Sequence, residues 1–444
     1  MSSIAEISTS MENVLTKSAE SLARPSGFVQ RNSKLTGPLF AKTLVLGWLG
    51  KPDASLSELC QASAELGLAI TPQGLEARLG SRAVGFLERL LNVAVGQLIT
   101  PDSVAIPILT RFGAVIIDDS TTIGLPDALA EVWSGTGERT GHNQSALKLQ
   151  VRFDLCSGRL TGPLLQAGRA NDRTSPLQTT PLPVGSLHLA DLGYFSLDLL
   201  EAEQVAESYW LRRLPVQTVV FDAKGCRWEL HRLLAAQSKA QGSDMIDLEV
   251  SLGVEKRFRC RLLAARVPQD VAEERRRKLH AEARHKGQKV SQARLDLADW
   301  TIYVTNCPAD LLTIPEALVL ARLRWQIELL FKLWKSHGQL DTSRSTNPSR
   351  ILAEIYAKLI GLLIQHWLLL LGCWSRPDRS LVKAASTVRH TVALLIAALR
   401  GHLLLSTAIE QITTAIALGC RMNSRRKAPN AYQLLIPFKE VPLA

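Results

Sequence analysis

Apolar positions in the first quarter of the chain recur at helical spacing, broken by Gly and Pro turns. The leucines that carry this pattern are Leu44, Leu46, Leu49, Leu56, Leu59, Leu66 and Leu68. The periodicity predicts a helical N-terminal domain over residues 1–108. A basic, polar segment, RPSGFVQRNSKL, lies within it at 24–35. A small DNA-binding domain and a plain helical scaffold both fit, because this region carries almost no net charge.

The pattern changes to extended chain at residue 114. Residues 114–118, AVIID, form a contiguous apolar run, which is typical of a central strand buried on both faces. Residues 147–155 then alternate between apolar and polar, and 159–165 can return as an antiparallel neighbour after a Ser-Gly turn. The elements expected next are a strand at 187–191, a helix at 196–207 and a strand at 208–214. This order of strands and helix predicts an α/β fold.

A second group of strands is expected between residues 216 and 305. Its members are 216–222, 245–252, 256–267 and 300–305. The charged stretch at 273–289, EERRRKLHAEARHKGQK, predicts a solvated helix and loop whose basic residues could also touch DNA. Beyond residue 340 the chain is expected to be helical to 418, and a basic tail with Arg425, Arg426 and Lys427 follows.

A long helix is predicted around the stretch 321–335, ARLRWQIELLFKLWK. Thr313 and Glu316 have the spacing of a capping box, Pro315 suits the first turn, and Gly338 is the expected stop. The apolar stripe that would pack on a core is Leu323, Ile327, Leu330 and Trp334. The sequence therefore predicts a helix that is packed along one side.

Three charged residues share one face of this helix. Arg324 and Glu328 are four residues apart, and Glu328 and Lys335 are seven apart. Ordinary surface ion pairs, Arg324 with Glu328 or Glu328 with Lys332, would satisfy the same spacing. The spacing alone favours such pairs, and only the rest of the chain can change that.

Positive charge is concentrated at the C-terminal end of the chain. The formal net charge of the 444 residues is +11, and residues 321–444 hold 17 Lys and Arg against 6 Asp and Glu. Such a local excess suggests a nucleic-acid partner, although an inert basic surface would look the same. Seven scattered cysteines without a CxxC pair fit a cytoplasmic protein without a zinc site. The polar N-terminus and the short apolar run at 359–373, which contains Gln365 and His366, predict a buried helix and no membrane segment.

Carboxylates stand where two of the predicted strands end. Asp118 and Asp119 follow the first strand and Asp191 closes the fourth, while Glu328 lies on the long helix. Side chains at strand ends suit a site at the edge of a sheet. Three carboxylates brought together can hold two divalent cations, and oxygen ligands favour Mg²⁺ or Mn²⁺. Such an ion pair suits the cleavage of a phosphodiester.

These residues resemble the bacterial insertion-sequence transposases of the DDE type, in the subgroup with a Tyr-x2-Arg-x3-Glu-x6-Lys signature. Arg324-x3-Glu328-x6-Lys335 matches that signature, with Ala321 at the Tyr position. Asp119-Ser-Thr and Asp191-Leu-Gly-Tyr-Phe match the segments around the family's two aspartates. GFVQRNSKL near the N-terminus and Tyr356-Ala-Lys are also similar. The resemblance covers roughly residues 25 to 370.

The resemblance implies an RNase H-like mixed sheet with flanking helices. Residues 109–215 and 306–345 would form this catalytic core, and 216–305 would be a β-rich insertion before the last catalytic helix. Residues 1–108 and 346–444 would be helical N- and C-terminal regions, the latter basic. The implied partner is DNA, with a homodimer in a paired-end complex.

The resemblance also implies that Asp119, Asp191 and Glu328 form the metal-binding triad. The family has a small residue and then Thr after its first aspartate, which favours Asp119 over Asp118. Neighbours on a strand point to opposite faces, so only one of the two should reach the metals. Asp191 could instead cap the helix that follows it.

Further residues are expected to contact DNA. Arg324, Lys332 and Lys335 would meet phosphates near the cut, since Arg forms paired hydrogen bonds and Lys acts as a point charge. Relatives are thought to use an aromatic residue in the insertion to stack on a displaced base, a role that would fall to Trp300. A buried core position on its strand is the other expectation for Trp300.

The implied activity is cleavage of DNA at the ends of a mobile element and joining of those ends to a target. Water would attack the phosphodiester and free a 3′ hydroxyl, which is the next nucleophile. Two alternatives remain open. A catalytically inactive or repurposed DNA-binding protein would fit Ala321, and a structure-specific nuclease would cut without joining.

Overall fold

The computed structural model describes residues 4–99, 104, 106–137, 144–376, 378–423 and 434–435, so the basic tail at 425–427 lies outside the described residues. The chain divides into two compact units. Unit 1 comprises Met1–Ala105, Ser120–Ala170 and Trp325–Tyr432, and unit 2 comprises Ile106–Asp119, Asn171–Arg324 and Gln433–Ala444. The four-part domain division expected from the sequence concerns independent folding units and stays a prediction.

A ten-stranded mixed sheet runs through the chain, and β1 is divided between the units after Asp119. Its strands are β1 (Val115–Leu125), β2 (Ser145–Asp154), β3 (Leu160–Ala167), β4 (Leu187–Ala190), β5 (Tyr209–Arg213), β6 (Val220–Phe221), β7 (Arg227–Trp228), β8 (Met245–Leu252), β9 (Phe258–Arg266) and β10 (Trp300–Thr305). The strand order is β3-β2-β1-β4-β5-β10-β9-β8-β6-β7. Strands β1, β4 and β5 are parallel, whereas β2 and β3 pair antiparallel. Every neighbouring pair in the remaining order, β5-β10-β9-β8-β6-β7, is also antiparallel. The predicted RNase H-like α/β fold is confirmed.

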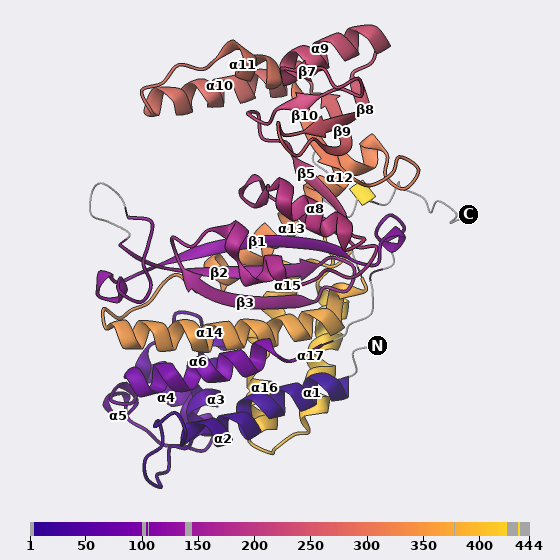
Figure 1. The fold of residues 1–444 in the computed structure, drawn as a ribbon. Coiled ribbons are helices and arrows are strands. Elements are labelled where there is room, and N and C mark those ends of the chain that lie inside the picture. Colours follow the sequence, from indigo (N-terminus) through magenta and orange to yellow (C-terminus); the bar gives the residue numbers. More distant parts are fainter. Residues whose placement is uncertain are drawn as a thin grey trace. The chain divides into compact units, whose positions relative to one another are not determined.

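Helices make up most of unit 1, and the predicted helical N- and C-terminal regions are confirmed. They are α1 (Ile4–Glu12), the π-helix η1 (Asn13–Ser18), α2 (Ala19–Ala23), α3 (Gly37–Gly50), α4 (Leu56–Glu65), α5 (Pro72–Glu76), α6 (Ser81–Val95), the 3₁₀-helix η3 (Asp127–Leu129), α13 (Trp325–Lys332), the π-helix η6 (Leu333–His337), α14 (Pro348–Leu369), the π-helix η7 (Leu370–Trp374), α15 (Leu381–His390), α16 (Val392–Leu399) and α17 (Leu405–Gly419). In Figure 1, α14 lies along β3, with α6 and α3 beyond it.

Helix α14 is the central helix of unit 1. Asn347 caps it, because its Oδ1 accepts a hydrogen bond from the backbone N–H of Arg350 at 3.1 Å. Gly361 lets α3 approach closely, since a Cβ atom there would lie 3.2 Å from the Val45 carbonyl oxygen. The helix segment Pro348–Trp374 is long and apolar enough to cross a membrane, but 94% of its apolar window is buried inside the protein. The buried helix expected around 359–373 is therefore present and longer than predicted.

Unit 2 joins its sheet to a further set of short helices. These are η2 (Leu109–Arg111), η4 (Asp172–Thr174), α7 (Pro176–Thr179), η5 (Leu192–Tyr194), α8 (Leu197–Val205), α9 (Leu230–Gln241), α10 (Gln269–His285), α11 (Gln292–Leu297) and α12 (Ile314–Leu323). A hydrophobic core centred on Trp210 and Leu262, both with no exposed surface, joins strands β5, β6 and β8–β10 to helices α8, α9 and α11. Strands β8 and β10 have the bounds predicted from the sequence, while the strand expected at 216–222 is reduced to β6.

The long helix predicted around 321–335 is present as three consecutive segments. Its start is as predicted, because Glu316 Oε2 accepts hydrogen bonds from the backbone N–H of Thr313 at 3.0 Å and from its hydroxyl at 2.8 Å. Helix α12 ends before Arg324, which keeps right-handed helical dihedrals, α13 follows, and the wider π-turns of η6 end at Gly338.

Candidate active site

The register between β1 and β4 places two aspartates at matching positions in unit 2. These parallel strands pair Val115 with Leu187, and their last registered pair is Asp118 with Ala190. Asp119 and Asp191 each come one residue later. Adjacent strands are about 4.8 Å apart, so two residues that follow a registered pair start from neighbouring backbone positions. Asp191 therefore follows the carboxyl end of β4, and Asp119 lies beside it within β1, which continues to Leu125.

Asp118 turns into the protein. Only 1% of its surface is exposed, and Gln178 of α7 donates from Nε2 to Asp118 Oδ2 at 2.8 Å. Nε2 of His188 on β4 lies 3.3 Å from the same oxygen, within ion-pair range but not aligned as a hydrogen bond. Asp118 is thus committed to partners on two neighbouring elements.

The contacts of His188 extend this buried polar group to two more side chains. Its Nδ1 lies 2.9 Å from Glu203 Oε1 and 2.8 Å from Arg212 Nη2. Arg212 also donates to Glu203 Oε1 at 3.0 Å and to the backbone carbonyl of His188. Burial raises the pKa of Glu203, but the charges of Arg212 and His188 outweigh it, so its pKa lies below the usual range. We call the group Asp118, Gln178, His188, Glu203 and Arg212 the inner network.

Asp119 lies on the other face of β1, as strand alternation requires. Its side chain is 18% exposed, and its Oδ2 lies 3.3 Å from Nη1 of Arg324, whose side chain is 28% exposed. Arg324 immediately follows α12, so this ion pair joins the end of that helix to β1. A carboxylate and a guanidinium that both reach solvent can meet a charged ligand.

Asp191 stands directly before η5 and is partly exposed. A role as a helix cap would require its side chain to accept a hydrogen bond from the backbone of that turn. The Asp191 side chain accepts no such capping hydrogen bond. A second carboxylate lies beside the same loop, because a Cβ atom on Gly193 would be 3.7 Å from Asp172 Oδ2. Nε of Arg173 also donates to the Gly193 carbonyl at 3.2 Å. The loop after Asp191 is therefore bordered by acidic and basic groups.

Glu328 belongs to unit 1, where it is exposed on α13. Nζ of Lys335, one segment further on, donates to the Thr122 carbonyl of β1 at 2.7 Å. This bond fastens η6 to the strand segment that follows Asp119. Lys332 is exposed, and Trp325, at the start of α13, is 54% exposed. Lys335 thus uses one of its three donors within the protein, whereas a DNA contact was expected from the sequence.

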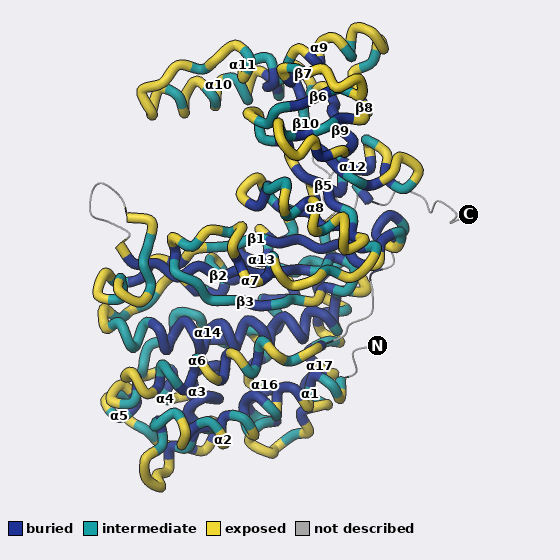
Figure 2. The backbone as a smooth tube through the Cα atoms, viewed as in Figure 1, coloured by how far each residue is buried: buried dark blue, intermediate teal, exposed yellow. Residues whose placement is uncertain are grey.

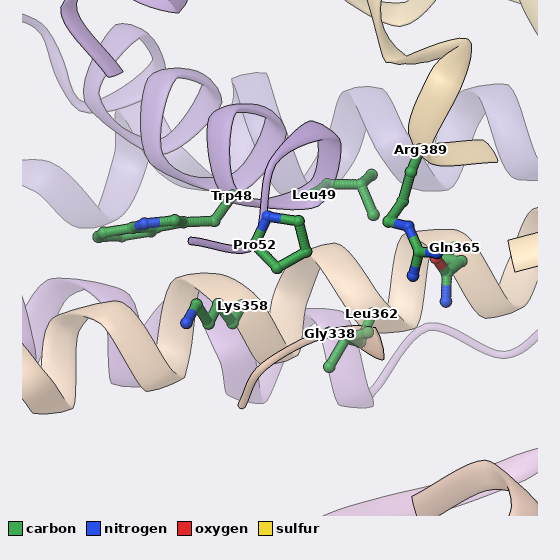
Figure 3. A pocket seen from close by; sticks show the side chains of 8 residues that line it. All are labelled: Trp48, Leu49, Pro52, Gly338, Lys358, Leu362, Gln365 and Arg389. Carbon is green, nitrogen blue, oxygen red and sulfur yellow. The ribbon is translucent and has the colours of Figure 1, made fainter. Parts of the chain in front are cut away.

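The end of η6 is held by charged side chains of two other unit 1 helices. Lys358 of α14 pairs with Glu354 at 2.7 Å and donates to the Gln339 carbonyl at 2.7 Å. Nη1 of Arg389 on α15 donates to the His337 carbonyl at 3.1 Å. Figure 3 shows Lys358 and Arg389 at the small hollow beside Gly338. The hollow leaves the centre of a water molecule only about 10 Å³ in which to move, which is room for about one water. It is therefore too small for a ligand.

Trp300 is buried in the core of unit 2. Only 7% of its surface is exposed, and the Arg266 guanidinium lies 4.7 Å from the centre of its ring. An aromatic that stacks on a displaced base needs an open ring face. Burial therefore favours the core role of Trp300 over the base-stacking role. The ring is buried because it belongs to the hydrophobic core of unit 2. Trp300 pairs with Arg266 of β9 at the start of β10.

The carboxylates fit a hard divalent cation in their chemistry. Asp119, Asp191 and Glu328 offer only oxygen, the donor that Mg²⁺ and Mn²⁺ prefer. Among the residues that the structure describes, no group of three or more His, Cys, Asp or Glu side chains is close enough to bind one metal ion. Asp119 and Asp191 belong to unit 2 and Glu328 to unit 1, so the triad stays a prediction.

Sequence reasoning missed the inner network. His188 and Arg212 lie on predicted strands, and Glu203 lies on a predicted helix, but their meeting depends on pairing between β4, β5 and β1. A charged residue within an otherwise apolar strand was the one available signal. Arg212 in SYWLRRL carries that signal, because a buried arginine needs carboxylate or carbonyl partners.

Fold and site together describe an enzyme of nucleic acids, with an RNase H-like sheet and aspartates at neighbouring positions of two parallel strands. Residues 110–364 match the model of the family described as Transposase DDE domain. The chain is 30% identical over 368 residues to the transposase for insertion sequence element IS231E of Bacillus thuringiensis subsp. finitimus, which covers 78% of this chain and 75% of that protein. The corresponding IS231B transposase of subsp. berliner is 29% identical, over 78% and 75% of the two chains. The IS1151 transposase of Clostridium perfringens is 24% identical, over 77% and 76%.

The chain belongs to the DDE transposase family. It is therefore an enzyme that acts on DNA, and domains of this family generally use divalent metal ions. The family expected from the sequence is confirmed. Membership of the subgroup with the Tyr-x2-Arg-x3-Glu-x6-Lys signature stays a prediction.

Proposed function

We propose that this transposase cuts DNA at the ends of its own element and joins those ends to a target. The observation that carries the proposal is the position of Asp119 and Asp191, each directly after the last registered pair of β1 and β4. Glu328, on a helix fastened to β1 through Lys335 and Thr122, is the third carboxylate. Family membership adds the reaction class.

Asp119, Asp191 and Glu328 would hold two divalent ions, Mg²⁺ or Mn²⁺. When bound, such ions supply activation of the attacking oxygen and charge stabilisation of the leaving oxygen. Arg324 would share Asp119 with them, because its guanidinium already lies 3.3 Å from that carboxylate. Its remaining N–H groups could hold a phosphate oxygen near the cut.

The chain's own residues would orient the DNA and hold the acidic groups in place. Lys335 keeps η6 on β1, so that Glu328 stays at a fixed distance along the helix from that anchor. Exposed Lys332 would add a point charge for phosphate. In the first step, water adds to the phosphorus as the P–O3′ bond breaks, which frees a 3′ hydroxyl. In the second, that hydroxyl attacks a target phosphodiester, so one P–O bond forms as another breaks.

We further propose that the protein acts in the cytoplasm as a homodimer that holds two element ends together. Seven free cysteines among the described residues fit a reducing compartment. The excess of basic residues after 321 fits a surface that meets DNA. In such a dimer, the active site of each protomer would act on one of the two element ends.

A second candidate is a DNA-binding protein that no longer cuts. Ala321 favours it, because the signature has a Tyr hydroxyl at this position. The three carboxylates of the predicted triad, Asp119, Asp191 and Glu328, are present and favour the active enzyme. The two candidates differ only in chemistry, so a reaction assay separates them.

The test is cleavage and strand transfer with Mg²⁺ on duplexes that carry the inverted repeats flanking the gene. Wild-type protein should release a 3′ hydroxyl and join it to plasmid DNA. Glu328→Gln and Asp191→Asn should each lose both steps and keep DNA binding, because a ligand is removed without disturbing the fold. Binding without cleavage by the wild type would favour the second candidate. Cleavage without joining would indicate a nuclease.

A further inference from the structure

Helix α10 and the loop after it form an exposed arm of unit 2. Figure 2 shows α10 as largely exposed or half-buried, and Ala272 is the one buried residue of the helix. Two arginines near its middle fix it to the sheet. Arg275 donates from Nη1 to the Trp300 carbonyl at 2.9 Å and from Nη2 to the Thr301 hydroxyl at 3.0 Å, and Arg276 pairs with Asp299. The arm is therefore held through the first half of its helix, while the residues from Arg277 onward are half-buried or exposed.

Acidic and basic residues occupy different parts of this arm. The acidic residues Asp270, Glu273 and Glu274 precede the two anchoring arginines. Residues 277–289, which we call the basic arm, hold five basic residues and one acidic residue. All five, Arg277, Lys278, Arg284, Lys286 and Lys289, are exposed. In the described part of the chain, Lys278 pairs with Glu274 at 2.7 Å, while the other four side chains have no ion pair.

Two of the exposed arginines lie on one face of α10. Arg277, His280 and Arg284 are three and four residues apart, so they form a stripe on one side of the helix. Ala281 lies in the same stripe and leaves room for a close approach. The chain then turns at Gly287, whose φ is +62°, and brings Lys286 and Lys289 past the helix end. Two unpaired arginines thus share one face of the helix, and two unpaired lysines lie beyond its end.

We propose that the basic arm binds the phosphate backbone of duplex DNA, without reading its sequence. Arg277 and Arg284 are about 10 Å apart along the helix axis. Each DNA strand carries a phosphate every roughly 3.4 Å of its axis, so this distance spans several phosphates. Long flexible Lys and Arg side chains suit backbone contacts, which carry no sequence information. The inference rests on the proposed function only in that DNA is the substrate.

The test compares two variants that each remove four positive charges from unit 2. The arm variant combines Arg277→Gln, Arg284→Gln, Lys286→Gln and Lys289→Gln. The control removes four exposed cations from the β6–α9 region: Lys224→Gln, Arg227→Gln, Arg232→Gln and Lys239→Gln. DNA affinity is measured over a series of salt concentrations, on a duplex with the element end and on a scrambled duplex. Thermal unfolding of both variants checks that they fold.

The arm variant should lower the slope of log affinity against log salt by about 2 to 3, since each phosphate contact contributes about 0.9. The loss should be equal on both duplexes, and the control should keep the wild-type slope. An unchanged slope in the arm variant, or an equal loss in the control, would overturn the proposal. A loss on the end duplex alone would mean base recognition. If the variant instead dissociates a wild-type oligomer, the partner of the arm is a second copy and the proposal is wrong.

This measurement is independent of the chemistry in the proposed function. Affinity can be determined without divalent ions, so a wild type that binds DNA but never cuts still tests the arm. Conversely, a wild type that cuts and joins while the arm variant keeps its salt slope would leave the proposed function standing and remove the arm from it.

Discussion

The two faces of β1 place neighbouring aspartates in opposite surroundings. Asp118 is 1% exposed and lies within the inner network. The side chain of Asp119 is 18% exposed and forms an ion pair with Arg324, whose side chain is partly exposed. The residues share a strand, a charge and almost the same backbone position. Strand alternation alone separates them. A carboxylate can thus support the fold or be open to a ligand according to which side of a sheet it occupies.

The difference also shows what each aspartate costs the protein. A buried carboxylate is stable only while its partners stay in place, and removing one partner leaves the others unpaired. An open carboxylate is screened by water and adds little to stability. Substitutions at the two positions should therefore affect different properties, and four experiments test this contrast.

The largest effect is expected on catalysis from the open face. Asp119→Asn should lower Mg²⁺-dependent cleavage at least about 10³-fold, equivalent to about 4 kcal/mol of transition-state stabilisation. It should leave DNA binding largely intact and change the free energy of unfolding by less than about 1 kcal/mol. Single-turnover cleavage of an end duplex measures the first and urea unfolding the second. Retention of more than a tenth of the wild-type rate would remove Asp119 from the triad.

The matched substitution on the inner face should act on stability. Asp118→Asn removes the charge that faces His188 and weakens the hydrogen bond from Gln178. We expect the free energy of unfolding to fall by about 2–3 kcal/mol. Cleavage per folded molecule should fall far less than in Asp119→Asn. If Asp118→Asn folds normally and is inactive, the roles of the two neighbours are reversed.

A smaller effect concerns the pH dependence of the inner network. The folded pKa of Glu203 is lowered, although burial alone would raise it, because Arg212 and His188 face it and outweigh the opposing charge of Asp118. Stability from this group is therefore present above the unfolded value, about 4.3, and is lost as the pH falls through the folded value. Wild-type protein should be more stable than Glu203→Gln at pH 7. The two should converge in acid unfolding curves, and a constant gap would show that charge is not the cause.

The smallest effect is expected at the link between Lys335 and Thr122. Lys335→Ala removes one hydrogen bond at the protein surface and should cost about 1 kcal/mol of stability. If the lysine also meets a phosphate, the salt slope of DNA binding should fall by about 1. Lys335→Arg serves as the control that keeps the charge. An unchanged slope would make Lys335 a fastening residue alone.

The sequence predicted elements well where one physical signal dominated. The apolar alternation of β8 and the apolar strand β10 have the predicted bounds, and the capping box of α12 is where Thr313 and Glu316 place it. Strand β1 extends beyond the predicted end, since residues 120–125 are mostly polar and gave no apolar run. The π-turns of η6 change hydrogen bonding without changing the apolar stripe, so no periodicity could reveal them.

The site was predictable only as a set of residue types. Strand ends and spacing selected Asp119, Asp191 and Glu328, but their partners lie far away in the chain. Arg324 meets Asp119 across 205 residues, and Lys335 meets a backbone carbonyl, which has no residue signature. The burial of Trp300, the first residue of β10, depends on the pairing of β10 with β9 and on the core packed around them. Long-range pairing was therefore the missing information.

One seam in the sheet has a consequence for how this enzyme can evolve. Strands β5 and β10 are antiparallel neighbours, and Arg213 pairs with Tyr303. The segment between these two residues leaves the sheet at the end of β5 and returns to it in β10, right beside that end. A short hairpin turn could therefore connect the two strands directly. The segment can therefore behave as an exchangeable cassette, lengthened or replaced in descendants while the strands of Asp119 and Asp191 stay where they are. A designer who removed it would need to supply a new cover for Trp210, which has no exposed surface.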